Sequence, residues 1–313
     1  MVNKRIFWAA QAVLKDGSYL DGVQAVGVDG NVPITSIPDM GRYYQKFRFE
    51  NLKKEFSINI SRVLNKSSTP FYTSSSHLLS SGGLNVGPGN IQEYDITIVY
   101  GSDAESNINS VESVTYKSCL ITSLNYNFNV DGLITEDIGL LCRAVETGGG
   151  SYTGSNQDGN ILKREDIGFT LPTEAQAAFV TNASDSVDGV TVNGLQSINI
   201  GISMNYQDLP DVGQTYNDVA DINKWTYMEF PVSVTASFTG VARALYPDVN
   251  IGAQNADNFP DTRTITVTGS SFTWSLGDKN YFVDYSVSGG DAGGGNVELT
   301  MNYTNEYSDF TVT

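Results

Sequence analysis

The sequence predicts an all-β fold with minor helical content, built from two copies of one β-rich module. Three observations support this prediction. The composition is rich in Tyr (17), Phe (14) and Gly (31), and Val, Ile and Thr recur in short alternating runs. One block of the chain recurs in its second half, and 313 residues leave room for two domains of about 100–200 residues each.

The internal repeat begins with two segments that share Gln, Pro, Asp and Gly at a constant spacing. Val23–Pro38 reads VQAVGVDGNVPITSIP and Leu195–Pro210 reads LQSINIGISMNYQDLP, and an Asp-x-Gly sequence follows each. The offset is 172 residues without a gap. Two later blocks follow in the same order: Glu55–Ser61 with Pro231–Ser237 at an offset of 176, and Leu120–Val130 with Thr262–Phe272. Three collinear blocks predict a duplicated module.

This repeat sets the expected domain boundaries. We expect a first module over residues 1–147, a Gly/Ser-rich linker or loop over 148–162 and a second module over 163–313. Helical patterns are confined to Thr173–Val180 (TEAQAAFV) and, more weakly, Thr73–Ser81 (TSSSHLLSS).

Several predicted strands alternate strictly between apolar and polar residues, which is typical of a half-buried sheet. The apolar members are Leu124, Tyr126, Phe128 and Val130; Ile198, Ile200, Ile202 and Met204; and Val297, Leu299, Met301 and Tyr303. Asn, Ser, Thr and Glu fill the alternate positions. Such a second face suits solvent or the wall of a lumen, and the pattern does not distinguish the two.

The chain is acidic, with 35 Asp and Glu against 18 Lys and Arg and a formal net charge of -17. A protein that holds nucleic acid needs the opposite sign, because cations neutralise the phosphates. Two interpretations remain: an ordinary soluble acidic surface, or a wall that must not retain DNA. The apolar run Ile6–Ala10 is too short for a secretory signal, and no run reaches the 18 residues of a membrane span, so we expect no membrane contact.

Groups that could catalyse a reaction are scarce. His77 is the only histidine, and neither a G-x-S-x-G nor a G-x-x-x-x-G-K-[ST] motif is present. The Gly-rich segment Gly289–Asn296 precedes a strand pattern, so it predicts a hairpin tip and no phosphate loop. We therefore assign no catalytic, cofactor-binding or metal-binding residues and expect no enzyme; a carboxylate-based glycosidase is the enzyme class left open. Cys119 and Cys142 lie on consecutive strands, where a bridge is conceivable, but two reduced thiols are the favoured expectation.

Taken in order, several short segments resemble the two-module tail tube (major tail) proteins of long-tailed bacterial and archaeal viruses. They are Gly22–Asp29, Asp39–Gly41, Lys163–Asp166, Glu229–Thr235, Leu276–Asn280 and Ser286–Asn296. The resemblance extends from about Gly22 to the C-terminus.

The resemblance implies a β-sandwich or split-barrel module with a small flanking helix, whose sheets join between subunits into a channel. Three two-module chains would close a pseudo-sixfold ring, and rings would stack head to tail into a tube. The implied partners are further copies of the chain, a tape measure protein, tail terminator or baseplate proteins, and viral DNA passing transiently through the lumen. The implied location is the virion tail, after assembly in the host cytoplasm. Two alternatives remain: a distal-tail, hub or terminator ring protein of the same module, or a carbohydrate-binding β-sandwich, which the many Tyr and Asn residues would suit.

Overall fold

The structure is a computed structural model that describes most of the chain. The described residues are 11–31, 34–37, 47–50, 55–66, 69–73, 91–101, 110–148, 161–179, 194–208, 226–242, 263–289, 296–305 and 310–313. Strands dominate them, and the one α-helix among them is α1 (Thr173–Phe179). The predicted all-β class with minor helical content is therefore confirmed, as is the predicted helix over Thr173–Phe179; Val180 lies outside the described residues. None of the described helices has the length and apolar character needed to cross a membrane.

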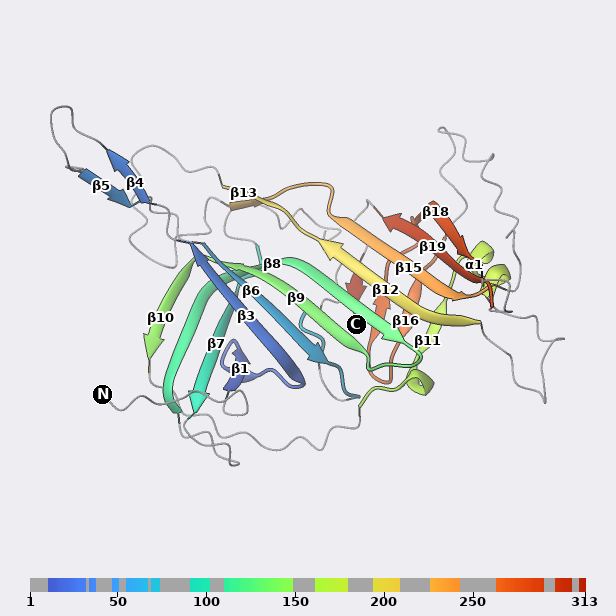
Figure 1. Ribbon diagram of the computed structural model, residues 1–313, viewed down its shortest axis with the longest axis horizontal. Coiled ribbons are helices and arrows are strands. Elements are labelled where there is room, and N and C mark those ends of the chain that lie inside the picture. The colour runs from blue at the N-terminus through green and yellow to red at the C-terminus, as the bar shows by residue number, and fades with distance from the viewer. Residues whose placement is uncertain are drawn as a thin grey trace.

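The main layer is an antiparallel sheet of eight strands, which crosses the whole molecule (Figure 1). From one edge to the other the strands are β3 (Val23–Asn31), β6 (Glu55–Val63), β9 (Thr135–Cys142), β8 (Ser110–Asn129), β12 (Leu195–Ser203), β15 (Ser233–Val241), β19 (Glu298–Asn305) and β18 (Tyr281–Ser288). Along each strand, residues that point into the core alternate with residues that do not. The three alternating segments predicted from the sequence fall on β8, β12 and β19 with the expected side buried.

The strand β8 has 20 residues and serves two sheets. Its C-terminal half lies between β9 and β12 in the main layer. Its N-terminal half pairs with β7 (Tyr94–Gly101) and β10 (Ala144–Gly148) in a second layer, which β1 (Gln11–Lys15) and β2 (Ser18–Tyr19) extend. The change of direction falls at Ser118, whose φ of 52° lies in the left-handed region.

The other end of the molecule has its own second layer, β11 (Gly168–Thr170), β16 (Thr266–Thr268), β17 (Thr273–Ser275) and β20 (Thr311–Val312). The hydrophobic core lies between the layers and forms one cluster with residues from both halves of the chain. Trp274 of β17, for example, packs against Tyr126 and Phe128 of β8, with ring centroids 5.7 and 5.1 Å apart. Two hairpins complete the fold: β4 (Ile34–Ile37) with β5 (Phe47–Glu50), and β13 (Tyr206–Asp208) with β14 (Thr226–Met228).

The pairing pattern of the first four main strands recurs in the second four. The orders β3-β6-β9-β8 and β12-β15-β19-β18 correspond strand by strand. The β3–β6 ladder shifts register between Val23 and Ala25, and the β12–β15 ladder shifts between Leu195 and Ser197, the same positions at an offset of 172. The β8–β9 and β18–β19 ladders also shift at corresponding places, before Ser123 and before Asp284.

The hairpins and second layers follow the same correspondence. Ile34 pairs with Glu50 as Tyr206 pairs with Met228. β1 pairs with β7 as β11 pairs with β16, and β10 pairs with β8 as β20 pairs with β17. The segments 23–31 and 195–203 thus occupy corresponding places in the two pairing patterns.

Two details of the predicted repeat are wrong. The ladders equate Ile58 with Ala236, so β6 and β15 correspond at an offset of 178 and not 176. A shift of two residues keeps every side chain on its face, so strand alternation cannot detect the error. The segment 120–129 corresponds to β18, and not to 262–272, which contains the short strand β16.

The expectation of two reduced thiols is also wrong, because Cys119 and Cys142 form a disulfide. Leu120 lies opposite Leu141 in the β8–β9 ladder, so the two cysteines face each other across it, with their Cα atoms 3.9 Å apart. Both are fully buried. His77, most of the predicted helix at 73–81 and residues 149–160 of the predicted linker lie outside the described residues.

Candidate functional site

The main sheet has one face against the core and one open face, and the open face is polar. Its members include Ala25, Gly27, Asp29 and Asn31 on β3; Glu55, Ser57, Asn59 and Ser61 on β6; Thr135 and Asp137 on β9; Asn125, Asn127 and Asn129 on β8; Ser197, Asn199, Gly201 and Ser203 on β12; Thr235, Ser237 and Thr239 on β15; Glu298, Thr300 and Asn302 on β19; and Asp284, Ser286 and Ser288 on β18. Amides and hydroxyls thus dominate this face.

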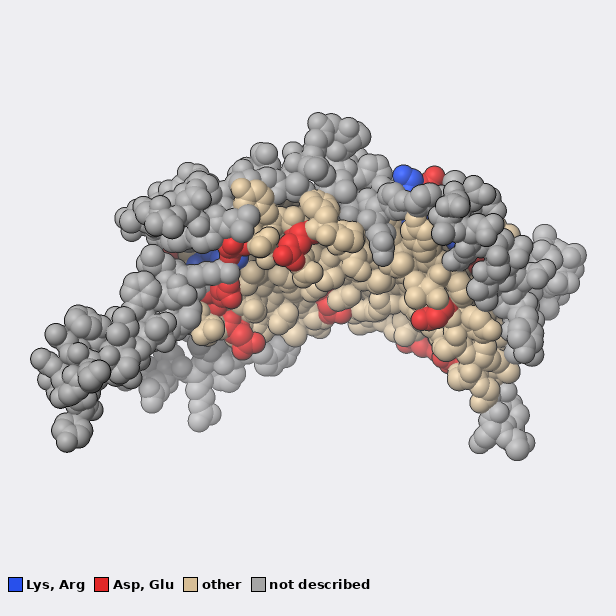
Figure 2. All heavy atoms as spheres, turned by 90° about the horizontal axis from the view of Figure 1, so that it is seen from above, with Lys and Arg blue, Asp and Glu red and all other residues tan. Residues whose placement is uncertain are grey.

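The charges on the open face have one sign. Asp29, Asp137, Asp284 and Glu298 lie on it, as does Glu55, which pairs with Arg143 just beyond the end of β9, and no Lys or Arg of the main-layer strands points to it. These strands hold two cations: Arg62 points into the core and is 1% exposed, and Lys117 lies in the N-terminal half of β8, in the second layer, where it pairs with Asp95. Figure 2 shows the molecule as an arch, with acidic side chains along its hollowed side and the visible Lys and Arg atoms away from the hollow.

Side-chain hydrogen bonds cross the open face from strand to strand. The Asn127 amide donates to the Asp137 carboxylate (3.2 Å) and accepts from the Asn199 amide. Farther along, the Asn302 amide donates to the Asp284 carboxylate (2.6 Å). These bonds link short polar side chains of neighbouring strands across the open face.

The sheet ends in two free edges. Among the described strands, β3 pairs only with β6 and β18 pairs only with β19, so no described strand covers the outer edge of either. The edge strand β18 also carries three of the large apolar side chains that are exposed: Val283 (55%), Tyr285 (40%) and Val287 (44%). A long edge with exposed apolar side chains is a template for a further strand.

We call the β8–β12 pairing the internal joint. It shows how deeply the corresponding side chains are buried when a neighbouring strand covers them. Tyr285 and Val287 correspond to Leu124 and Tyr126 of β8, which are both fully buried. Val28 of β3 corresponds to Ile200 of β12, which is also fully buried, whereas Val28 is only partly so. The apolar side chains at the two free edges are therefore more exposed than their counterparts because no described strand lies beside them.

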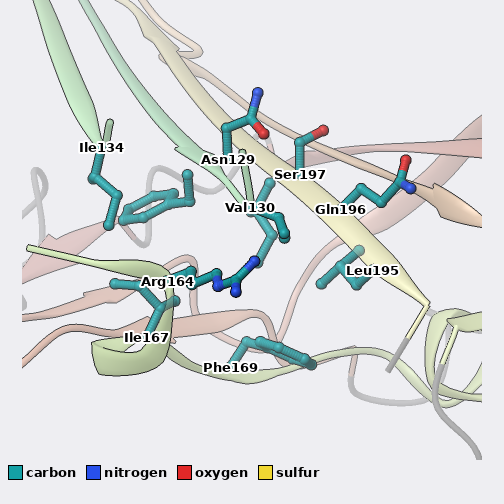
Figure 3. A pocket seen from close by; sticks show the side chains of 11 residues that line it. Asn129, Val130, Ile134, Arg164, Ile167, Phe169, Leu195, Gln196 and Ser197 are labelled. Atoms are coloured by element: carbon teal, nitrogen blue, oxygen red, sulfur yellow. The ribbon is translucent and has the colours of Figure 1, made fainter. Parts of the chain in front are cut away.

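A small cavity of about 70 Å³ lies at one end of the internal joint (Figure 3). Phe128 and Val130 line it from the β8 side, Leu195 from β12 and Phe169 from β11, and Arg164 reaches toward it from the 3-10 turn η2 (Arg164–Asp166). Small-molecule pockets usually measure about 300–1,000 Å³, so this cavity is too small to serve as a substrate site.

The structure places few reactive groups together. Within the described ranges, no three His, Cys, Asp or Glu side chains converge as metal ligands would. The Gly-rich segment 289–296 joins two antiparallel partners, β18 and β19, although residues 290–295 are not among those described. Reactive residue types in the sequence do not point to the two edges. The apolar alternation of Tyr281–Ser288 does, because it predicts a strand for which no neighbour is assigned.

Neither the scan against protein-family models nor the search of curated proteins gives a match for this chain.

Proposed function

We propose that this protein is the structural subunit of a viral tail tube, built from a duplicated β module. The observation that carries the proposal is the sheet itself: eight strands, a free edge at either side, and an open face without a cation. Two different edges on opposite sides of one sheet make a head-to-tail contact, and such contacts close into rings when the rotation between copies allows it. The resemblance to two-module tail tube proteins adds the expectation of three chains per ring.

The dimensions of such a ring suit a conduit for DNA. Three sheets of eight strands give a barrel of ~24 strands. With strands about 4.8 Å apart and tilted about 40° to the axis, the backbone circle is about 45–50 Å across. Barrels of 16–18 strands already enclose an aqueous channel, so a ring of this size leaves a wide lumen after the side chains are counted.

The charge of the open face supports the same use. With the hollowed side turned inward, the lumen would carry Asp29, Asp137, Asp284 and Glu298 from every copy. DNA binding depends on cations that release the phosphate counterions, and this wall offers none from the eight strands. A genome would pass through without being held.

Negative-stain electron microscopy of the purified protein tests the proposal directly. We expect rings or hollow tubes with a central channel, at protein concentrations that favour assembly. A protein that stays monomeric at high concentration, with an intact β-rich spectrum, contradicts it. Single rings that never stack would favour the distal-tail, hub or terminator role, and binding of glycans by the monomer would favour the carbohydrate-binding alternative.

A further inference from the structure

The internal joint is a template for a contact between two molecules. It joins the last strand of the first four, β8, to the first strand of the second four, β12. By the strand correspondence, β18 is the counterpart of β8 and β3 is the counterpart of β12. These counterparts are the two free edges of the main sheet, so the chain contains one completed copy of a joint and both halves of a second.

We propose that β18 of one chain adds to β3 of the next in the register of the internal joint. In the internal joint Ile200 lies opposite Tyr126 and Gly201 opposite Asn125. The ladder correspondences carry these pairs over to Val28 opposite Val287 and Asp29 opposite Ser286. The inference deepens the proposed tube function, on which it rests, by naming the partner, a second copy of this chain, and the residues that meet.

The side chains at the two edges fit this register. Tyr285, the largest exposed residue on β18, falls opposite Gly30, beside which lies the Phe56 ring. At this position the internal joint has Leu124 opposite Ile202, two side chains of medium size. In the contact between chains, a large residue, Tyr285, and the smallest one, Gly30, take their places. On the open face, Asn31 falls opposite Asp284, and an amide can donate to a carboxylate there.

Three other registers of β18 against β3 are less favourable. A slip of one residue turns the apolar side chains of β18 to the open face. A slip of two residues in one direction sets Asp29 directly opposite Asp284, and like charges facing each other across strands are destabilising. A slip of two in the other direction sets Val287 opposite Gly30, so the large Tyr285 side chain no longer faces a glycine.

The hairpins provide a second, independent correspondence. In the internal joint, the hairpin β13–β14 reaches over the first half of the molecule: the Tyr206 hydroxyl donates to Ile121 O (2.8 Å) and the Arg143 guanidinium to the Asp208 carboxylate (2.8 Å). Its counterpart, β4–β5, projects beyond the sheet from the end of β3 (Figure 1). In a chain added at β3, the counterpart of Ile121 is Phe282, next to the exposed Val283. The hairpin β4–β5 would therefore cover this part of the neighbour's edge.

Disulfide trapping of the full-length protein tests the register. Asp29→Cys with Ser286→Cys places two thiols directly opposite on the accessible open face, whereas the native Cys119–Cys142 bond is fully buried. Under mild oxidation we expect a ladder on a non-reducing gel that ends at the closed oligomer. Asp29→Cys with Ser288→Cys, and Asp29→Cys with Asp284→Cys, represent the two-residue slips and should crosslink at least tenfold less. Preferential crosslinking of either slipped pair overturns the register.

A charge placed at the edge separates this inference from the tube proposal. Val287→Lys sets a cation on the apolar side of the β18 edge and should abolish rings, while Ser286→Lys, on the same strand but on the open face, should leave them intact. If the unmodified protein forms no rings at all, the tube proposal fails. If rings form and Val287→Lys assembles like Ser286→Lys, the tube stands and the β18–β3 contact is refuted.

Discussion

A buried ion pair in the first half of the molecule offers a quantitative test of how charge is accommodated in the core. Arg62 of β6 and Glu136 of β9 form a salt bridge, with side chains only 1% and 0% exposed. Glu136 also accepts a hydrogen bond from the Phe71 N–H (2.9 Å), and the Arg62 guanidinium donates to Thr69 O (2.7 Å). The corresponding pair in the second half is Gly240 opposite Leu299, which carries no charge.

We expect Glu136→Leu to cost a large part of the folding free energy. The uncompensated Arg62 cation accounts for about 3–5 kcal/mol. The Phe71 N–H loses its acceptor, which adds about 1–3 kcal/mol. Typical total stabilities are about 5–15 kcal/mol, so the variant should unfold at far lower denaturant or fail to fold.

The double variant Arg62→Met/Glu136→Leu should recover at least about 3 kcal/mol relative to Glu136→Leu, because apolar replacements of buried ion pairs are often neutral. The assay is urea unfolding followed by circular dichroism, with Glu136→Gln as the variant that keeps an acceptor for Phe71 but loses the charge. A double variant no more stable than Glu136→Leu refutes the reasoning, since the cost would then arise from shape and not from the unpaired cation.

Three further predictions concern the open face, the disulfide and the buried tyrosines. Asn127→Lys with Asn199→Lys should make assembled particles retain DNA, and the logarithm of the DNA-binding constant should fall with the logarithm of the salt concentration by about 0.9 per phosphate contact. The matched variants Asn127→Gln and Asn199→Gln should not retain DNA. Equal retention by both sets would contradict the proposal that the open face lets DNA pass without holding it. Replacing Cys119 and Cys142 by Ala opens a link between residues 23 positions apart and should cost about 3 kcal/mol in urea unfolding; no change, and no effect of reductant on the parent protein, would show that the bond does not form in solution. Burial raises the pKa values of Tyr94, Tyr126, Tyr206 and Tyr303 above 10.0. The folded state then holds protons that the unfolded state releases, so stability falls as the pH rises above about 10; absorbance at 295 nm should show these residues ionising only with unfolding, and early ionisation of all tyrosines in a folded protein would contradict their burial.

The fold class and the faces of the strands could be predicted because they depend on local alternation. Tyr126 and Ile200 are buried, and Asn127 and Asn199 lie on the open face, where their patterns placed them. The first repeat block could be predicted because Gln24 and Gln196, and the Pro, Asp and Gly residues that follow each of them, are related by one offset of 172 residues. The ladders add a physical meaning, because both glutamines lie at the register shift of their strand.

What could not be predicted depends on contacts between distant residues. The offset of 178 between β6 and β15 is fixed by ladder pairing, and alternation is blind to it. The dual role of β8 depends on the bend at Ser118, a residue type with no marked preference for the left-handed region. The disulfide depends on Cys119 and Cys142 meeting across a ladder whose register was unknown. The two free edges could not be predicted for the same reason, because a strand can be recognised as an edge only when the pairing of all the other strands is known.

The proposed contact between chains differs from the internal joint in a way that assembly would require. The internal joint presents Tyr126 to Ile200, two large side chains on strands of one chain, and forms as the chain folds. The contact between chains presents Val287 to Val28, and both strands are exposed until a partner arrives. At this position the two valines bury less apolar surface than Tyr126 and Ile200 do, and the acidic Asp29 and Asp284 penalise the slipped pairing. A contact that repeats the register of the internal joint but buries smaller side chains at this position favours ordered addition of whole subunits over aggregation of unassembled ones.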